Sequence, residues 1–482
     1  MIPNLNDPAL VKSQAFIDGC WIGEASLSVV DPSTGMSLGE VAELNADDAR
    51  RAVEAAEAAL PAWRALTAGE RSRILRRWFD LIVDAQEDLA MILTSEQGKP
   101  LHEAIGEISY AASFVEWFAE EARRMYGEII PTHRPDSRLL VIRQPVGVVA
   151  AITPWNFPAA MITRKVAPAL AAGCTVVLKP AMQTPLTALA LAELAQRAGV
   201  PSGVFNVVTG SSRIIGAELT AHPSVRKLSF TGSTEVGKLL MAQCAPTMKK
   251  LSMELGGNAP FIVFEDADID AAVEGVMASK YRNSGQTCVC VNRIYVQQSV
   301  ASAFEARLAE AVARLKVGPG LDAGVQQGPL IDQAAVTKVE DHVRDAVEQG
   351  ARLVVGGARH PLGQSFFQPT VLADCTAEMA VAREETFGPL AALFTFRDEA
   401  EAITLANATE VGLAGYFYTR DLARAWRVAE ALEVGMVGIN TGLISTELAP
   451  FGGIKESGMG REGSRHGLED YTELKYICMA GL

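Results

Sequence analysis

From about Leu139 onward, short runs rich in valine and isoleucine alternate with helical segments. The runs in chain order are VGVVAAIT, TVVLKP, VFNVVTG, RKLSFTG and KKLSMEL. Strand–helix alternation at this pace predicts parallel βαβ units, which form an open sheet covered by helices. A second series of the same kind starts at about Pro260 and continues to GMVGIN. Because single cores stop growing near roughly 250–300 residues, we expect an α/β protein with two successive lobes.

The first third of the chain is expected to be helical after a short β-rich start. Apolar residues recur at helical spacing, opposite charged faces, over residues 47–60, 71–93 and 104–125. These three segments are predicted to be three helices that precede the first strand of the alternating region.

The charge balance limits the partners that the protein attracts. Asp and Glu outnumber Lys and Arg by 57 to 43, and the formal net charge is −14. A chain this acidic lacks the general attraction for phosphate backbones that drives nucleic-acid binding. We therefore expect no nucleic-acid partner, and we expect any bound anion to be held by a local group of basic side chains.

Other features of the sequence favour a cytoplasmic protein. The N-terminal residues contain no apolar run behind a basic stretch, and no charge-free apolar stretch reaches about eighteen residues. We therefore expect neither a signal peptide nor a transmembrane helix. The chain has 7 cysteines and no CxxC pair, which favours free thiols in a reducing compartment. The 6 histidines show no pair at metal-ligand spacing, so no metal site is expected.

Three motifs place polar groups where predicted strands end. Asn156 lies in TPWNFP between two prolines that restrict the backbone, and Lys179 ends the run VVLK before a helix. In FTGSTEVG, a turn at Gly232 precedes Ser233, which has the position of a helix N-cap. Ligands of open α/β sheets bind at the carboxyl ends of the strands, and helix N-termini favour anions. Each motif by itself is also compatible with a capped turn or a solvated lysine.

Two further residues have the chemistry of a nucleophile and a general base. Cys288 in GQTCVCVNR lies in a polar turn, where its thiolate could be exposed. A cysteine whose thiolate is stabilised is a good nucleophile for a carbonyl carbon. Glu254 in MELGGNAP ends an apolar segment, where burial raises a carboxyl pKa. Taken alone, a free cysteine is more often an unreactive residue that packs in the core. The alternative for the glutamate is that it forms a salt bridge. The GxGxxG match in GMGREG is rejected as a dinucleotide fingerprint, because too few residues follow it for a βαβ unit.

Together these segments resemble the aldehyde dehydrogenase family over nearly the whole chain. The motifs that carry the resemblance, in the family's order, are TPWNFP, LKPA, FTGS, ELGGNAP, GQTC, EETFGP and NTG followed by PFGGIKESG. The resemblance implies an NAD(P)-dependent oxidoreductase with a Rossmann-type cofactor lobe, a catalytic α/β lobe and a small oligomerisation element. It assigns residues 1–125 and 146–254 to the cofactor domain, 255–445 to the catalytic domain, and 126–145 with 466–482 to the oligomerisation element.

The resemblance also implies catalytic roles for three of these residues. Cys288 matches the nucleophile that forms a thiohemiacetal with the aldehyde and then a thioester. Asn156 matches the amide that stabilises the oxyanion together with the backbone N–H of Cys288. Glu254 matches the base that activates water to hydrolyse the thioester.

A cofactor cleft is implied by the same resemblance. The residues expected to line it are Trp155, Asn156, Lys179, Met182, Gly232, Ser233, Leu255, Glu385 and Phe387. Family members that prefer NAD usually have a glutamate three residues after the lysine, where it binds the adenosine ribose. This chain has Met182 at that position, so the barrier to a 2′-phosphate is absent. We expect NADP to be accepted and preferred, with NAD as the alternative.

Within the family, the chain is most similar to the subfamily that oxidises succinate and glutarate semialdehydes. The matching segments are ITRKVAPALAAGC, KYRNSGQTCVCVNR and the C-terminal run from NTGLIS to TELKY. Arg164, Arg282 and Ser445 match the residues that hold the substrate's distal carboxylate, and the alternative is that the two arginines form surface ion pairs. The alternatives are another aliphatic or uncharged aldehyde such as betaine aldehyde, and a catalytically silent protein of the same fold.

Two expectations concern assembly and redox chemistry. The resemblance implies a homodimer or homotetramer, with a strand pair near 126–145 and a tail from about Tyr471 that adds an edge strand to a neighbouring subunit. Cys290 lies two residues beyond the nucleophile. It is either a small packing residue or the partner of Cys288 in a reversible disulfide.

Overall fold

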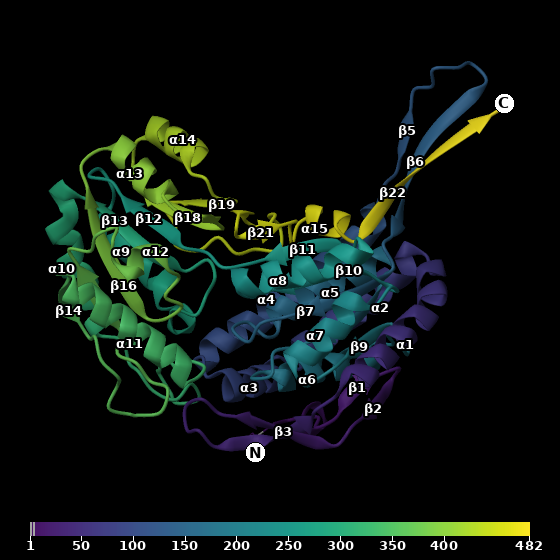
Figure 1. The fold of residues 1–482 in the computed structure, drawn as a ribbon, viewed down its shortest axis with the longest axis horizontal. Helices are drawn as coiled ribbons and strands as arrows, with labels where there is room; N and C mark the ends of the chain where they lie inside the picture. The colour runs from purple at the N-terminus through teal and green to yellow at the C-terminus, as the bar shows by residue number, and fades with distance from the viewer. Residues whose placement is uncertain (1, 3–4) are drawn as a thin grey trace.

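Two α/β lobes lie side by side in the computed structural model, which describes residue 2 and residues 5–482 (Figure 1). A narrow arm of strands projects away from both lobes, and the C-terminus lies at its tip. The two lobes and the alternation of strands and helices confirm the predicted α/β class.

The first lobe is built on an eight-stranded sheet whose central strands are parallel. In order across the sheet the strands are β2 (Cys20–Ile22), β1 (Ala15–Ile17), β9 (Phe205–Val207), β8 (Thr175–Lys179), β7 (Val148–Ile152), β10 (Val225–Thr231), β11 (Lys250–Glu254) and β21 (Gly458–Met459). The chain builds outward from β7 to β9 on one side and then returns to add β10 and β11 on the other. The order therefore reverses between β7 and β10, and such a switch point is where open sheets bind ligands.

Helices cover both faces of this sheet because the side chains of each strand alternate between the faces. Val149 and Ala151 pack with α2 to α6, whereas Val148 and Ala150 pack with α1, α7 and α8. The helices are α1 (Ala46–Ala65), α2 (Ala68–Asp84), α3 (Gln86–Gln97), α4 (Leu101–Glu121), α5 (Ala160–Ala172), α6 (Pro185–Arg197), α7 (Ser212–Ala221) and α8 (Thr234–Cys244). Capping boxes at Asn45 and Thr67 start α1 and α2.

The helix predicted over residues 71–93 is wrong as a single element. The chain forms two helices there, α2 and α3, which meet at Ala85. Ala85 leaves the helical conformation with φ −95° and ψ 13°. No proline or glycine stands at the break. The periodicity continues across it, and the sequence has no local signal for it. In the fold, Asp88 of α3 accepts the backbone N–H groups of Asn6 and Asp7, so the N-terminal segment fastens to the redirected helix.

The second lobe contains a seven-stranded, mainly parallel sheet. Its strands in order are β14 (Arg352–Val355), β15 (Thr370–Ala373), β16 (Leu390–Phe396), β13 (Val291–Gln297), β12 (Ala259–Val263), β18 (Ala414–Tyr418) and β19 (Met436–Ile439). The covering helices are α9 (Ile269–Lys280), α10 (Ala301–Ala313), α11 (Gln333–Glu348), α12 (Ala380–Arg383), α13 (Glu399–Asn407) and α14 (Leu422–Ala431). Phe261 and Val263 face α9 and α10, while Ile262 faces the core under α11, α13 and α14.

The projecting arm is a three-stranded antiparallel sheet in the order β22 (Thr472–Ala480), β6 (Ser137–Pro145) and β5 (Glu128–Ile130). The C-terminal tail joins the strand pair of the arm: β22 pairs with β6 of its own chain along its whole length, from Thr472↔Pro145 to Ala480↔Ser137. The addition of this edge strand to a neighbouring subunit stays a prediction. This intrachain ladder satisfies one edge of β22 and leaves its other edge open. Ile129, Leu474 and Tyr476 are exposed on the arm.

Short elements complete the chain. They are β3 (Ala25–Val30) with β4 (Ser37–Ala42), β17 (Val411–Gly412) with β20 (Ile454–Lys455), α15 (His466–Glu469), and the 3-10 turns at Pro8–Leu10, Ala122–Arg124, Ala245–Thr247, Arg282–Gly285 and Gln298–Val300. In the described part of the chain, no helix is both long enough and apolar enough to cross a bilayer.

Candidate active site

Four neighbouring strands of the first sheet end beside the residues that the motifs singled out. The register pairs Ile152 of β7 with Lys179 of β8, and Thr231 of β10 with Glu254 of β11. Asn156 follows β7, and Gly232 and Ser233 follow β10. The structure therefore brings Asn156, Lys179, Ser233 and Glu254 to the carboxyl edge of one sheet, around its switch point.

Cys288 reaches this edge from the other lobe. It lies in the turn before β13, and Glu385 lies before β16, the strand that pairs with β13. A cavity of about 330 Å³ between the lobes is lined by Cys288, Glu254 and Asn156 together with Glu385. The amino ends of the second sheet thus face the carboxyl ends of the first.

The turn that carries Cys288 is held in an unusual backbone conformation. Asn283 and Ser284 have positive φ values of 50° and 55° although neither is a glycine, and both are buried. Side chains on each side compensate for this strain: Ser284 donates to the carbonyl of Gly328 at 2.8 Å. Beyond the cysteine, the Tyr416 hydroxyl donates to the carbonyl of Val289 at 2.8 Å. Such strain persists where the surroundings over-determine the backbone, as they do here.

The Cys288 thiol lies in a site that disfavours its ionisation. Burial raises the pKa of this thiol to about 12, and the nearby guanidinium groups of Arg164 and Arg282 oppose the rise. The thiol is therefore protonated at neutral pH, and a base must take its proton when the sulfur attacks.

Asn156 is fixed by hydrogen bonds on its side chain and its backbone. Its Nδ2 donates to the carbonyl of Gln286, two residues before the nucleophile, at 3.0 Å. Its own carbonyl accepts from Lys99 Nζ at 2.8 Å and from Asn283 Nδ2 at 2.9 Å. These bonds hold the Asn156 loop against the Cys288 turn, although the two belong to different lobes.

Glu254 is a buried carboxyl with room around it. Its Oε2 has no hydrogen-bond partner among the described residues. A Cβ at Gly452 would come within 2.8 Å of Oε1, so only glycine leaves the carboxyl its space there. Burial raises the pKa of Glu254 well above its usual value, and the nearby Glu462 carboxylate adds to the rise. A carboxyl with a raised pKa is suited to act as a general base.

Arg164 is completely buried on α5. Its guanidinium forms an ion pair with Glu462 at 2.8 Å and lies over the ring of Phe451, 4.0 Å from its centre. Lys165 pairs with the same carboxylate. The ion pair that sequence reasoning weighed for Arg164 therefore exists, but it lies in the interior, beside Glu254, and not at the surface. Glu462 was missed because nothing local distinguishes it in the loop GMGREG.

Arg282 lies close to Cys288 in the other lobe, and Ser445 lies two residues before Glu447, which accepts a hydrogen bond from Ser113 of α4. Arg282 begins the 3-10 turn before Cys288, and its guanidinium lies over the ring of Phe157 at 5.3 Å. Its Nε is buried without a hydrogen-bond partner among the described residues. The charge of Arg282 opposes the rise in the pKa of the Cys288 thiol, so it lies near the reacting sulfur.

A larger cavity of about 880 Å³ continues from the catalytic one along the first sheet. The two share Trp155, Gly232 and Ser233 in their walls, and Lys179 and Met182 line the outer part. Leu255 and Phe387 line the inner part, where the Phe387 ring stands edge-on to Trp155 at 5.6 Å. The cavity thus runs across the switch point, and its shape suits an extended dinucleotide.

Two ends of this cavity carry groups suited to such a ligand. Lys179 is buried, its Nζ donates to Ser212 Oγ at 2.6 Å, and desolvation lowers the pKa of its ammonium to about 8. A buried amine with no ion-pair partner in the described chain suits ribose hydroxyls or a phosphate. At the inner end Glu385 accepts from the backbone N–H of Gly257 at 3.3 Å, and burial raises the pKa of its carboxyl to about 7. The residues present therefore fit a nicotinamide dinucleotide.

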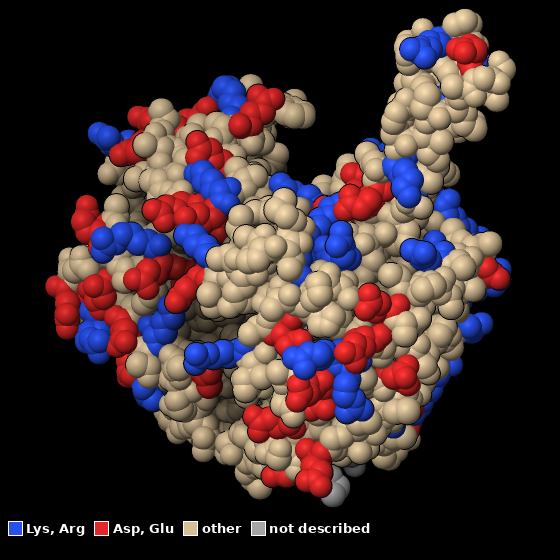
Figure 2. All heavy atoms as spheres, turned by 45° about the vertical axis from the view of Figure 1, so that its right-hand side comes forward, with Lys and Arg blue, Asp and Glu red and all other residues tan. Residues whose placement is uncertain are grey.

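No cluster of three or more His, Cys, Asp or Glu side chains at metal-binding geometry occurs among residues 2 and 5–482. On the face of Figure 2, acidic and basic side chains are interspersed over both lobes, and the arm is mainly uncharged.

A Rossmann-type sheet, a cleft at its switch point and a cysteine facing a buried carboxyl define a dinucleotide-binding enzyme with a thiol nucleophile. Residues 21–477 match the model of the aldehyde dehydrogenase family, and the chain belongs to that family.

Similar proteins extend over essentially the whole chain. A glutarate-semialdehyde dehydrogenase of Pseudomonas aeruginosa is 63% identical over 99% of this chain and 100% of its own. The NADP-dependent succinate-semialdehyde dehydrogenase GabD of Escherichia coli is 64% identical over 98% and 99%. A 3-sulfolactaldehyde dehydrogenase of Pseudomonas putida is 62% identical over 99% of each chain. A crystal structure of an E. coli NADP-dependent enzyme superposes with a TM-score of 0.98 at 64% identity, covering 99% and 100%.

Proposed function

We propose that this protein oxidises an aldehyde that carries a distal carboxylate, with succinate semialdehyde as the substrate and NAD(P) as the hydride acceptor. The observation that carries the proposal is that Cys288, Glu254 and Asn156 line one cavity. This cavity adjoins a longer cleft whose shape suits a dinucleotide. The presence of all three residues argues against a catalytically silent protein of this fold.

In the proposed mechanism, Cys288 Sγ attacks the aldehyde carbon while its thiol proton passes through the Glu254 carboxylate to solvent, and a thiohemiacetal forms. The oxyanion is stabilised by the Asn156 amide and the Cys288 backbone N–H. A nicotinamide ring bound in the cleft would accept the hydride of the thiohemiacetal carbon, and Cys288 would then carry a thioester. Glu254 then takes a proton from water, the hydroxide attacks the thioester carbon, and Cys288 leaves as the thiolate.

The cofactor proposal is NADP, with NAD as the alternative. Lys179, Ser233 and Glu385 would hold the adenosine ribose, the phosphates and the nicotinamide ribose, while Trp155, Gly232, Leu255 and Phe387 would line the cleft. Met182 lines the outer cavity near Lys179 and has no charge that would repel a 2′-phosphate. The relative from E. coli is named for NADP, which agrees with this preference.

The substrate proposal rests on buried cations. Arg164 and Arg282 together place positive charge near Cys288, and Ser445 would be a third contact for the carboxylate. A quaternary ammonium such as betaine aldehyde would meet these charges unfavourably. Glutarate semialdehyde is the main alternative, because one methylene is worth only about 1–3 kcal/mol in a pocket. Other aliphatic aldehydes are the remaining alternative, and one relative is named for an aldehyde with a sulfonate.

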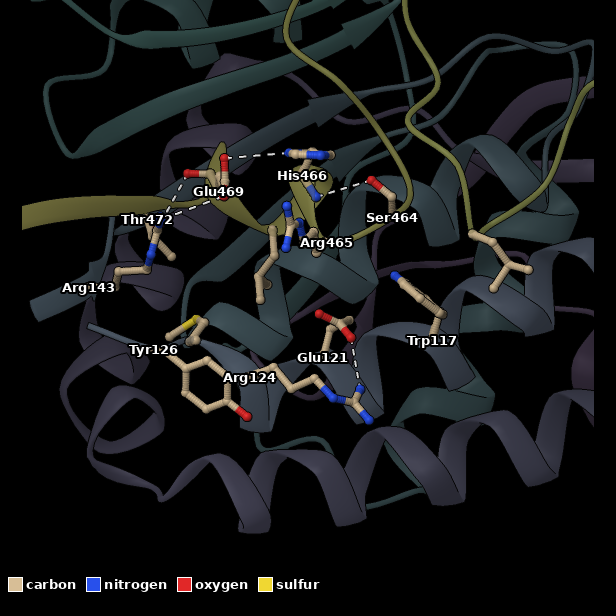
Figure 3. A pocket seen from close by; sticks show the side chains of 13 residues that line it. Trp117, Glu121, Arg124, Tyr126, Arg143, Ser464, Arg465, His466, Glu469 and Thr472 are labelled. Carbon is tan, nitrogen blue, oxygen red and sulfur yellow. Dashed lines mark hydrogen bonds and ion pairs between the residues drawn. The ribbon is translucent and has the colours of Figure 1, made fainter. Parts of the chain in front are cut away.

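We also propose a homodimer or homotetramer in the cytoplasm, with the arm as the assembly element. The domains are proposed as residues 1–125 with 146–254, 255–445, and 126–145 with 466–482. Exposed apolar residues on the arm support the assembly proposal. At the arm's base lies a pocket of about 480 Å³, which Trp117, Glu121 and Arg465 help to line (Figure 3). The buried Trp117 Nε1 has no acceptor among the described residues.

Steady-state kinetics test the proposed function directly. We expect kcat/KM to be highest for succinate semialdehyde, with glutarate semialdehyde, 3-sulfolactaldehyde and the uncharged butanal as comparisons, each with NADP and NAD. A preference for butanal, or turnover that is equal for charged and uncharged aldehydes, would contradict the substrate proposal. Light scattering at micromolar concentration measures the oligomeric state.

A further inference from the structure

Tyr110 lies on α4 beside the residues proposed to hold the substrate carboxylate. Its ring packs edge-on against Phe114 at 4.9 Å, and Phe114 in turn lies 5.6 Å from the guanidinium carbon of Arg164. One turn further along α4, Ser113 donates to the carboxylate of Glu447 at 3.2 Å, two residues from Ser445. This face of α4 therefore closes the region between α5 and the Ser445 loop.

Three buried donors in this region have no acceptor. The Tyr110 hydroxyl, Arg282 Nε and Arg164 Nε are each buried without a hydrogen-bond partner among the described residues. They come from three separate elements, α4, the turn before Cys288 and α5. Buried polar groups in native proteins are almost always hydrogen-bonded, and a group of orphaned donors indicates an absent acceptor. A carboxylate, with two oxygens and about four lone-pair sites, is an acceptor that can serve several donors at once.

The charges around Tyr110 also favour an anion. Arg164 and Lys165 share the carboxylate of Glu462, and the pKa of the nearby Glu254 is raised, which favours its uncharged form. Arg282 adds a further cation. Burial raises the pKa of the Tyr110 phenol, against the opposing effects of Arg164, Arg282 and Ser445, so the hydroxyl keeps its proton and acts as a donor at neutral pH.

We propose that the Tyr110 hydroxyl donates a hydrogen bond to the distal carboxylate of the substrate and is a specificity-determining residue of this enzyme. The inference rests on the proposed function. The Tyr110 hydroxyl is a neutral donor that acts together with the two guanidinium groups. It lies on α4, a helix that none of the sequence motifs includes. Because an O–H···O bond is shorter than an N–H···O bond, the Tyr110 hydroxyl holds the carboxylate closely and so limits how far the aldehyde reaches toward Cys288.

The test is the variant Tyr110→Phe, which keeps the ring that packs on Phe114 and removes only the hydroxyl, which lies beside the Ser445 side chain. We measure kcat/KM for succinate semialdehyde and for butanal, and express specificity as their ratio. The ratio is expected to fall roughly tenfold or more, since hydrogen bonds to charged groups are the stronger kind. Tyr126→Phe, at an exposed tyrosine, is the matched control and should leave the ratio unchanged.

A second measurement uses succinate as a probe that binds without reacting. Its inhibition constant against the aldehyde should rise in Tyr110→Phe by a similar factor, while the dissociation constant of NADP stays constant. An unchanged ratio, or equal losses for both aldehydes, would overturn the role of Tyr110. Failure of the proposed function is separate from this, because it would appear in the wild-type protein as the absence of any preference for succinate semialdehyde over butanal.

Discussion

Lys99 Nζ donates a hydrogen bond of 2.8 Å to the backbone carbonyl of Asn156, which lies 57 positions further along the chain. The same ammonium pairs with Glu107 at 2.5 Å and lies over the ring of Phe157 at 3.8 Å. The other oxygen of Glu107 accepts the N–H of Ala159 at 2.9 Å. A buried ion pair thus holds the loop that carries the proposed oxyanion amide.

We predict that Lys99→Met lowers kcat with a smaller effect on the KM for aldehyde, because the Asn156 amide loses its fixed position. The variant should also lose about 3–5 kcal/mol of stability, since the partner carboxylate stays buried without its cation. Chemical denaturation and steady-state kinetics measure the two effects. Adding Glu107→Gln should restore part of the stability and little of kcat. Recovery of both together would assign Lys99 a purely structural role.

Glu254→Gln is predicted to separate acylation from hydrolysis. The variant should give one burst of reduced cofactor and then slow turnover, because glutamine cannot activate water. In the wild type, the raised pKa of Glu254 means that its carboxylate form increases as the pH rises. Thioester hydrolysis should therefore accelerate with pH through that pKa. Rapid-quench kinetics check this, with Cys288→Ala as the control that gives neither burst nor turnover but still binds cofactor. Unchanged turnover in Glu254→Gln would remove this residue from the role.

Arg282→Ala and Arg164→Ala should differ in kind. Arg282→Ala is expected to raise the KM for succinate semialdehyde, at a cost of about 1.5–3 kcal/mol in transition-state binding, with far less effect on butanal. Arg164→Ala should produce the same selective loss and also destabilise the fold, because it leaves Glu462 with one cation fewer in the interior. The measurements are kcat/KM for both aldehydes and the midpoint of thermal unfolding. Equal losses for both aldehydes would show that the arginines support the structure only.

Met182→Glu should shift the cofactor preference toward NAD. A carboxylate in the outer cavity would repel a 2′-phosphate, and like charges in contact cost several kcal/mol. We expect kcat/KM for NADP to fall roughly tenfold or more, with the value for NAD held or raised. Met182→Gln has nearly the same shape without the charge and serves as the control. An equal fall with both cofactors would show that the position does not discriminate.

A reversible Cys288–Cys290 disulfide remains a prediction. Cys290 is buried, and its Sγ lies 3.3 Å from the carbonyl of Val291, a contact that the thiol would give up on forming the bond. If the switch operates, mild peroxide should inactivate the enzyme and a thiol reductant should restore it, whereas Cys290→Ala should over-oxidise irreversibly. Mass analysis after non-reducing digestion should show a peptide two hydrogens lighter. Oxygen adducts on Cys288 alone would contradict the disulfide.

Much of the fold followed from local patterns in the sequence. Alternating strands and helices predicted two α/β lobes, because burial on both faces of a parallel sheet demands continuous apolar runs. Motifs at the strand ends singled out Asn156, Lys179 and Glu254. These residues lie at the same edge of the sheet because parallel strands bring their carboxyl ends together. The helix break at Ala85 and the ion pairs of Arg164 and Lys165 with Glu462 escaped prediction. Each depends on contacts with segments far away in the chain.

The sequence by itself determined which chemical groups are available, namely a thiol, a carboxyl, an amide and several cations in recognisable motifs. Only the tertiary structure decided which of them meet. Arg164 and Lys165 find Glu462 almost three hundred positions away, with a separation of 297 for the lysine. Tyr110 and Lys99 carry no motif at all. The strength of a hydrogen bond or ion pair depends on the distance between its atoms and on the exclusion of water. Both are fixed only when the whole chain has folded.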